Sequence, residues 1–134
     1  MTKAYEFRQA ARDLEQLHRE IAELDIDDER AWKKQLIDLR RRLQTQISSV
    51  GALVSKFSEF GVDRETARSF GNRFAAMRSK IALHQADWPA VAIDQKDPLY
   101  LESLANVRRA NRDFADRIEE MVTIMERALH GSPQ

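Results

Sequence analysis

The residues of this chain that could do chemistry are few and widely spaced. Its histidines are His18, His84 and His130, and it has no cysteine. Disulfides, zinc–thiolate sites and cysteine nucleophiles are therefore excluded. The histidines are scattered, and no glycine-rich phosphate loop or nucleophile elbow occurs. We therefore predict no metal site and no cofactor, and we do not expect an enzyme.

Three polar residues interrupt apolar stripes that otherwise repeat at helical spacing: Gln46, His84 and Asn111. A buried amide typically fixes the register of packed helices, so we predict that Gln46 and Asn111 hydrogen-bond across the core. A ligand pocket built on these amides is the alternative. His84 is either a packed or capping residue near the end of its helix, or a functional group.

The segment His84-Gln85-Ala86-Asp87-Trp88-Pro89 resembles the H-box of sensor histidine kinases, in which a proline follows the histidine by five residues. That box lies on a helical hairpin whose dimer forms a four-helix bundle. The resemblance implies that His84 is a phosphoacceptor in a phosphotransfer or pseudo-phosphotransfer bundle. We expect no kinase activity, because the sequence shows no nucleotide-binding domain.

The elements that position these residues are predicted to be amphipathic helices. Apolar residues recur at alternating three- and four-residue steps, which is the period of one helix face. The predicted helices span about 3–24, 28–60, 63–87 and 98–130, and 131–134 is expected to be a loose tail.

Local signals mark the predicted ends of these helices. Asp63 and Asp97 are placed to cap helix N-termini, and Pro98 fits the first helical position. Gly61 can take the left-handed conformation that ends a helix, and Pro89 disfavours helical geometry at the residue before it. The apolar connector that precedes Asp97 is expected to fold back over the end of the core.

The fold predicted from these signals is an all-α, antiparallel up-down-up-down four-helix bundle, a single domain over residues 1–134 with coiled-coil-like seams. Helix 1 is shorter than helices 2 and 4. The chain has only 4 glycines and 3 prolines, too few for the turns of a sandwich or barrel. The alternative is an extended helical hairpin that completes its core by forming a homodimer.

The charge of the chain is balanced overall but unevenly distributed. With 22 basic and 22 acidic residues, it has no net field to attract nucleic acid or an anionic membrane. The first and last quarters are acidic and the middle two are basic, so unlike charges are expected to stabilise the contacts between helices 1 and 2 and between helices 3 and 4. The alternative is a docking face that steers a partner by its charge. We predict a cytoplasmic protein without a membrane partner, because no signal core or membrane-spanning run is visible.

The strongest functional signal is an apolar stripe on the second half of helix 2. Because helix 1 is short, we expect the chain start to lie opposite Gln46 and to leave this stripe uncovered, and an uncovered stripe usually marks a docking site. The residues predicted to bind a partner are Ile47, Val50, Val54, Lys56, Phe57 and Glu59. The alternative is that this end of the bundle closes over them.

These observations predict a non-catalytic protein–protein interaction module, an adaptor or regulator that binds a protein partner or a second copy of itself. No small-molecule substrate is expected. The first alternative is phosphotransfer through His84. The second is weak nucleic-acid binding through the basic face of helices 2 and 3.

Overall fold

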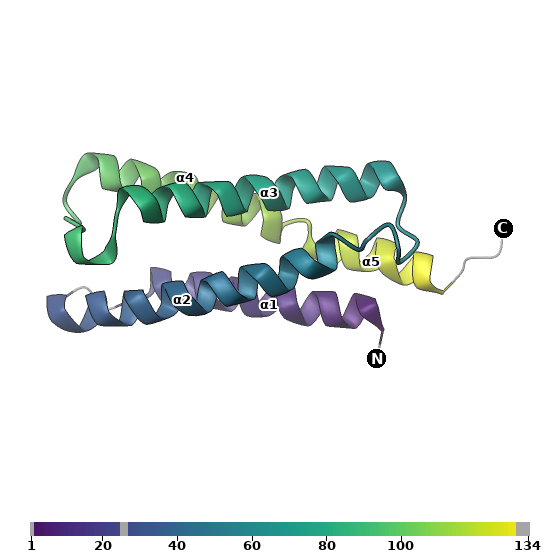
Figure 1. Ribbon diagram of the computed structural model, residues 1–134, viewed down its shortest axis with the longest axis horizontal. Helices are drawn as coiled ribbons and strands as arrows, with labels where there is room; N and C mark the ends of the chain where they lie inside the picture. Colours follow the sequence, from purple (N-terminus) through teal and green to yellow (C-terminus); the bar gives the residue numbers. More distant parts are fainter. Residues whose placement is uncertain (1, 25–26, 131–134) are drawn as a thin grey trace.

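The computed structural model describes residues 2–24 and 27–130. Every regular element in those ranges is helical: α1 (Lys3–Ala22), α2 (Glu29–Val54), α3 (Arg64–Asp87), the 3-10 turn η1 (Ala90–Ala92), α4 (Pro98–Ala115) and α5 (Ile118–Leu129). The prediction of an all-α protein is confirmed, and the helices pack as an elongated bundle (Figure 1). None of the described helices combines the length and the apolarity that crossing a bilayer requires.

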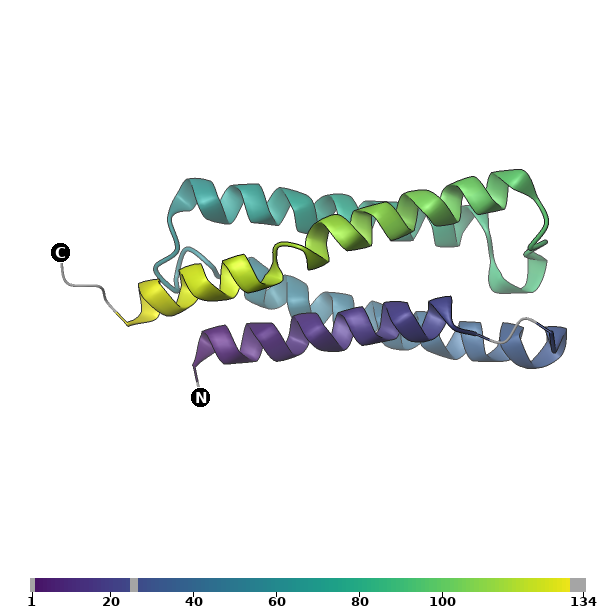
Figure 2. The same ribbon diagram turned by 180° about the vertical axis from the view of Figure 1, so that it is seen from behind.

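The bundle has two layers. Helices α1 and α2 lie side by side in one layer, and α3 and α4 lie side by side in the other (Figure 1). Helix α5 continues from the end of α4 and packs against α1, as the view from behind shows (Figure 2). The two ends of the bundle are therefore built differently: α5 completes one end, and the connector between α3 and α4 completes the other.

The predicted helix starts are confirmed where a side chain caps them. The carboxylates of Asp28, Asp63 and Asp97 each accept a backbone N–H of the helix that follows, at 3.2, 3.1 and 2.9 Å. These bonds satisfy donors that the first turn of a helix leaves free. Pro98 opens α4, and Gly61 has the left-handed φ of 90° that was expected.

Two helix ends differ from the prediction. Helix α2 ends at Val54, and residues 55–61 form irregular turns. The Ser55 hydroxyl donates to the Ala52 carbonyl, so the Lys56 N–H bonds the Leu53 carbonyl instead, and the helix tightens and stops. The last predicted helix is divided into α4 and α5 by a tighter turn at 116–117. The predicted tail at 131–134 lies outside the described residues.

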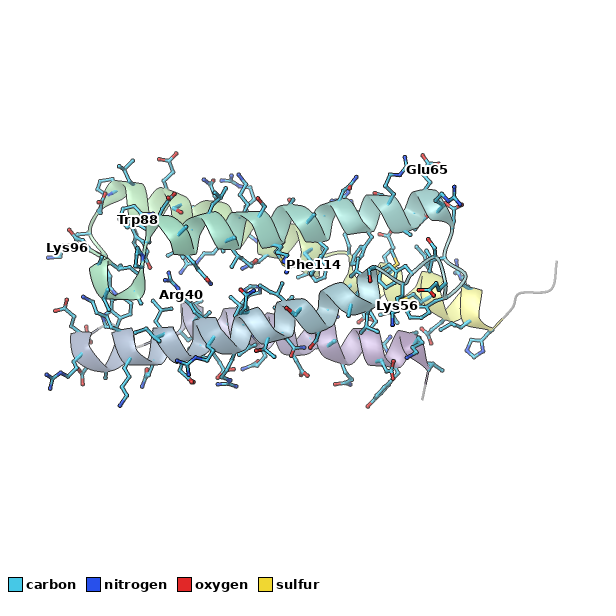
Figure 3. All side chains as sticks on the ribbon, viewed as in Figure 1. Arg40, Lys56, Glu65, Trp88, Lys96 and Phe114 are labelled. Carbon is cyan, nitrogen blue, oxygen red and sulfur yellow. The ribbon has the colours of Figure 1, made fainter. Side chains whose placement is uncertain are left out.

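The end of the bundle that contains α5 is filled by aromatic rings, and we call it the aromatic end. The Phe7 ring lies 5.2 Å from that of Phe57 and 5.7 Å from that of Phe70. The Phe70 ring in turn lies 5.2 Å from that of Phe114, which also contacts Phe74. Figure 3 shows Phe114 between the two layers. These rings join α1, α3, α4 and the turn after α2 in one core.

The opposite end, which we call the loop end, holds a smaller cluster. The connector between α3 and α4 folds back as predicted, because Ala90 and Ile93 are buried against Trp32 and Leu36 of α2 and Tyr100 of α4. Trp88, labelled in Figure 3, marks the point at which α3 stops before the connector.

Ion pairs join α1 to α5. The Glu119 carboxylate lies 3.0 Å from the Arg8 guanidinium and 2.7 Å from that of Arg12, and hydrogen bonds from both lower the pKa of Glu119. These groups are exposed, so their contribution to stability is small. None of the ion pairs among the described residues crosses from α1 to α2 or from α3 to α4. The expected attraction of unlike charges at those contacts is therefore not expressed as ion pairs among the described residues.

Candidate functional site

The apolar stripe predicted to bind a partner is buried. Ile47 and Val54 are 2% and 8% exposed, and Val50 and Phe57 are fully enclosed. Only the flanking Lys56 and Glu59 are exposed. The prediction that this stripe is uncovered was therefore wrong, because a single copy of the chain already encloses it. The argument for a protein partner or a second copy at this place is lost with it.

The reason lies in the register of α1 on α2. The Gln46 side chain donates to the Ala10 carbonyl at 2.9 Å, and the Phe7 ring packs on that of Phe57. The start of α1 therefore reaches the turn after α2, well beyond the expected position opposite Gln46. Helix α5 packs against α1, and its Met121, Val122 and Met125 are buried in the same core as the stripe.

The two amides predicted to pair do not pair with each other. Gln46 fixes the register of α2 on α1 through the Ala10 carbonyl. The Asn111 Oδ1 atom is buried and has no hydrogen-bond partner in the structure. Asn111 instead lines a cavity, as does His18, whose Nε2 atom is also buried without a partner.

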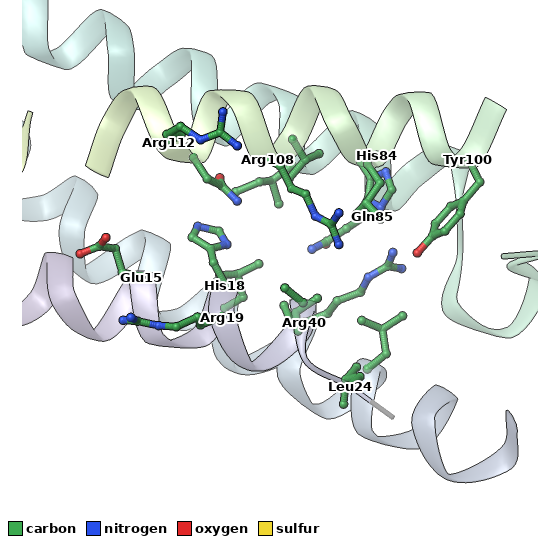
Figure 4. Close-up of a pocket in the computed structure, with 18 of the residues that line it drawn as sticks. Glu15, His18, Arg19, Leu24, Arg40, His84, Gln85, Tyr100, Arg108 and Arg112 are labelled. Atoms are coloured by element: carbon green, nitrogen blue, oxygen red, sulfur yellow. The ribbon is translucent and has the colours of Figure 1, made fainter. Parts of the chain in front are cut away.

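This cavity has a volume of about 710 Å³ and lies between α1, α2, α3 and α4 toward the loop end (Figure 4). It is partly open to solvent, and α1 and α4 both contribute to its wall. Exposed residues of both helices, Arg19, Arg108 and Arg112, lie on its rim.

Most of the cavity wall is apolar, and all four helices contribute to it. The apolar lining residues are Ile21, Ala22, Leu24, Trp32, Leu36, Leu43, Ile81, Leu101, Leu104, Val107 and Ala115. The apolar part of this wall suits an occupant with an apolar body.

Arg40 of α2 contributes a positive charge to the cavity lining. Its side chain is half-buried, and its Nη1 atom donates to the Trp88 carbonyl at 2.8 Å. No ion pair within the described ranges involves it. Burial lowers the pKa of Arg40, but a guanidinium stays charged at neutral pH. Arg40 and Arg108 both project into the space between the layers, on the side of His84 and Tyr100 (Figure 4).

Tyr100 is held beside these arginines by two rings. Its centroid lies 5.6 Å from that of His84 and 5.4 Å from that of Trp88. Burial raises the pKa of Tyr100, against the opposing effect of the charges on Arg40 and Arg108. The phenol is therefore protonated at neutral pH and can donate a hydrogen bond.

His84, the predicted phosphoacceptor, is only 7% exposed. Its Nδ1 lies 2.7 Å from the Ser103 hydroxyl oxygen. Burial and the Arg40 charge lower the pKa of His84 to about 4, although Asp87 acts in the opposite direction. A phosphoacceptor must be reached by a second protein domain, so this burial argues against phosphotransfer through His84.

His18 and Glu15 are cavity residues that sequence reasoning passed over. They lie three residues apart on α1, the spacing that puts two side chains on one helix face. The Glu15 carboxylate pairs with the Arg12 guanidinium, and burial lowers the pKa of His18 to about 4. The described ranges contain no group of three or more histidine, aspartate or glutamate side chains that could hold a metal ion.

The positions of His18 and Arg40 in the sequence indicate that both lie on the apolar face of their helix. His18 lies four residues after Leu14 and three before Ile21, and Arg40 has the same relation to Leu36 and to Leu43. Both therefore share the apolar face of their helix. Of three consecutive arginines, Arg40 turns inward, whereas residues 41 and 42 are exposed.

No family model matches this chain, and neither a curated protein nor a solved structure matches it.

Proposed function

We propose that this protein is a non-catalytic binding protein that holds a small, largely apolar molecule in the cavity between α1, α2, α3 and α4. The observation that supports this proposal is the cavity itself, which has a volume of about 710 Å³ and a wall with apolar side chains from four helices. Small-molecule sites typically measure roughly 300–1,000 Å³.

The groups on the cavity wall support binding rather than catalysis. General acid–base catalysis at neutral pH needs a group that titrates near that pH. The pKa values of His18 and His84 are both lowered to about 4, so both are neutral, and Glu15 is already paired with Arg12. The arginines stay protonated and can only donate hydrogen bonds.

The test uses N-phenyl-1-naphthylamine, an uncharged dye whose fluorescence rises in apolar surroundings. We expect saturable binding of one dye molecule per folded chain. Leu104→Trp adds a large ring at a wall residue and should abolish the fluorescence. Leu99→Trp is the matched control, because Leu99 lies on the same helix, is 66% exposed and does not line the cavity. It should bind the dye as the unaltered protein does.

Two results would contradict the proposal. One is a folded, unaltered protein that shows no saturable dye binding. The other is undiminished binding by Leu104→Trp in a variant whose circular dichroism and melting temperature show that it is folded. In either case the cavity would not be a site.

A further inference from the structure

The charges around the cavity are unbalanced, although the chain as a whole carries no net charge. Among the described residues, the lining includes the four arginines Arg19, Arg40, Arg108 and Arg112 and the two carboxylates Glu15 and Asp116. Glu15 is paired with Arg12, which lies outside the cavity lining. Arginines therefore outnumber carboxylates among the described lining residues, an imbalance that favours a negatively charged group there.

Arg40 differs from the other three arginines because it is half-buried, whereas they are exposed. A buried charge is costly unless a group of opposite charge or several hydrogen bonds compensate for it. Within the described residues Arg40 has one hydrogen bond, to the Trp88 carbonyl, and no ion pair. That bond uses Nη1 and leaves the other guanidinium N–H groups free to bind an anion.

Two further donors converge on the same end of the cavity. The Arg108 side chain enters from α4, and the Tyr100 hydroxyl points inward beside Arg40 (Figure 4). The charges of both arginines act to lower the pKa of the Tyr100 phenol, against the larger effect of its burial. The Tyr100 ring is fixed by its contacts with His84 and Trp88, so its hydroxyl is oriented before a ligand arrives.

We propose that the ligand is an amphipathic monoanion, an apolar body that carries one carboxylate. The carboxylate binds the free N–H groups of Arg40, and Arg108 and the Tyr100 hydroxyl are further donors. The apolar body lies along the wall formed by α2 and α4. One carboxylate matches the one inward, half-buried guanidinium, and a planar carboxylate suits the two-pronged geometry of arginine. This inference rests on the proposed function, since it specifies the ligand of the same cavity.

The experiment displaces the uncharged dye with three ligands that share one chain length: decanoate, decanol and decyltrimethylammonium. All are used below their micelle-forming concentrations at about pH 7.5, where decanoate is ionised. We expect decanoate to displace the dye at a concentration about 10-fold lower than decanol, because a hydrogen bond to a charged group adds that much affinity. The cation should be the weakest competitor.

Arg40→Met tests the assigned guanidinium. It should remove the advantage of decanoate over decanol, so that the two displace the dye from this variant at concentrations within about 2-fold of each other. Arg41→Met is the matched control, since it removes the same charge from an exposed neighbouring position. It should keep the preference for decanoate. Tyr100→Phe removes only the hydroxyl and should weaken decanoate by about 3-fold, without an effect on decanol.

The outcomes separate the two proposals. If the dye binds but decanol displaces it as well as decanoate does, the carboxylate assignment is overturned and the proposed function stands. If Arg41→Met reduces the preference as much as Arg40→Met does, the effect is one of overall charge and the assignment to Arg40 is overturned. If the dye does not bind to the folded protein, both proposals fail.

Discussion

Replacing Phe57 with alanine decides whether the second half of the predicted helix 2 is core or surface. The Phe57 ring is fully enclosed and lies 5.2 Å from the Phe7 ring and 5.6 Å from the Phe70 ring. Its removal loses both ring contacts and leaves a void. The free energy of unfolding should fall by about 3–5 kcal/mol, the usual cost of such a truncation. That is a large part of the roughly 5–15 kcal/mol that stabilises a typical domain.

The loss is measured by urea unfolding followed by circular dichroism, with the slope against denaturant compared between variants. Leu99→Ala is the control, since Leu99 is 66% exposed and its truncation should cost no more than about 0.5 kcal/mol. If Phe57→Ala does not fold, Phe57→Leu should still lose roughly 1–2 kcal/mol. A loss below about 1 kcal/mol for Phe57→Ala, with an unchanged slope, would refute the packing described here.

Two further predictions concern stability. Gly61→Ala should lower the free energy of unfolding, measured in urea, by about 1–2 kcal/mol, because Gly61 has a φ of 90°. Gly71→Ala, inside α3, should raise it by about 0.5–1 kcal/mol. Equal effects of the two changes would contradict the left-handed conformation of Gly61. Burial lowers the pKa values of His18 and His84 to about 4, below the ordinary value of about 6.5. Between these pH values the unfolded chain binds more protons than the folded chain. The free energy of unfolding should therefore fall as the pH decreases from about 6.5 to about 4. The urea midpoint at several pH values measures this loss of stability. The midpoint should change less with pH in His18→Gln than in the unaltered protein. A midpoint that does not change with pH would show that the two histidines are not buried.

Much of the fold could be read from local signals. Asp63 and Asp97 cap helices because a carboxylate before a helix has its donors within three residues, so the sequence alone contains both partners. The end of α2 could not be read in this way. The apolar spacing continues from Val50 to Phe57, although the Ser55 hydroxyl donates to the Ala52 carbonyl between them and the helix ends there. Periodicity reports which face is buried, and not whether the backbone is still helical.

The site depended on contacts that are distant in the sequence. The register of α1 on α2 is fixed by the bond between Gln46 and Ala10, and each residue of shift moves a helix by about 1.5 Å along its neighbour. Ala10, rather than the chain start, lies opposite Gln46, and this shift changed the expected uncovered stripe into core. The cavity depends on space left by four segments at once, so no single stripe revealed it. What could be read from the sequence was that His18 and Arg40 lie on otherwise apolar faces.

The unequal ends of the bundle separate the part that holds the chain together from the part proposed to recognise a ligand. Rings from α1, α3 and α4 and from the turn after α2 interlock at the aromatic end, whereas the cavity extends toward the opposite end. Changes at Leu104 or Arg108 leave those rings untouched. Such a protein can alter what it recognises by successive substitutions without unfolding on the way, which makes it a tractable scaffold for selecting new binding preferences.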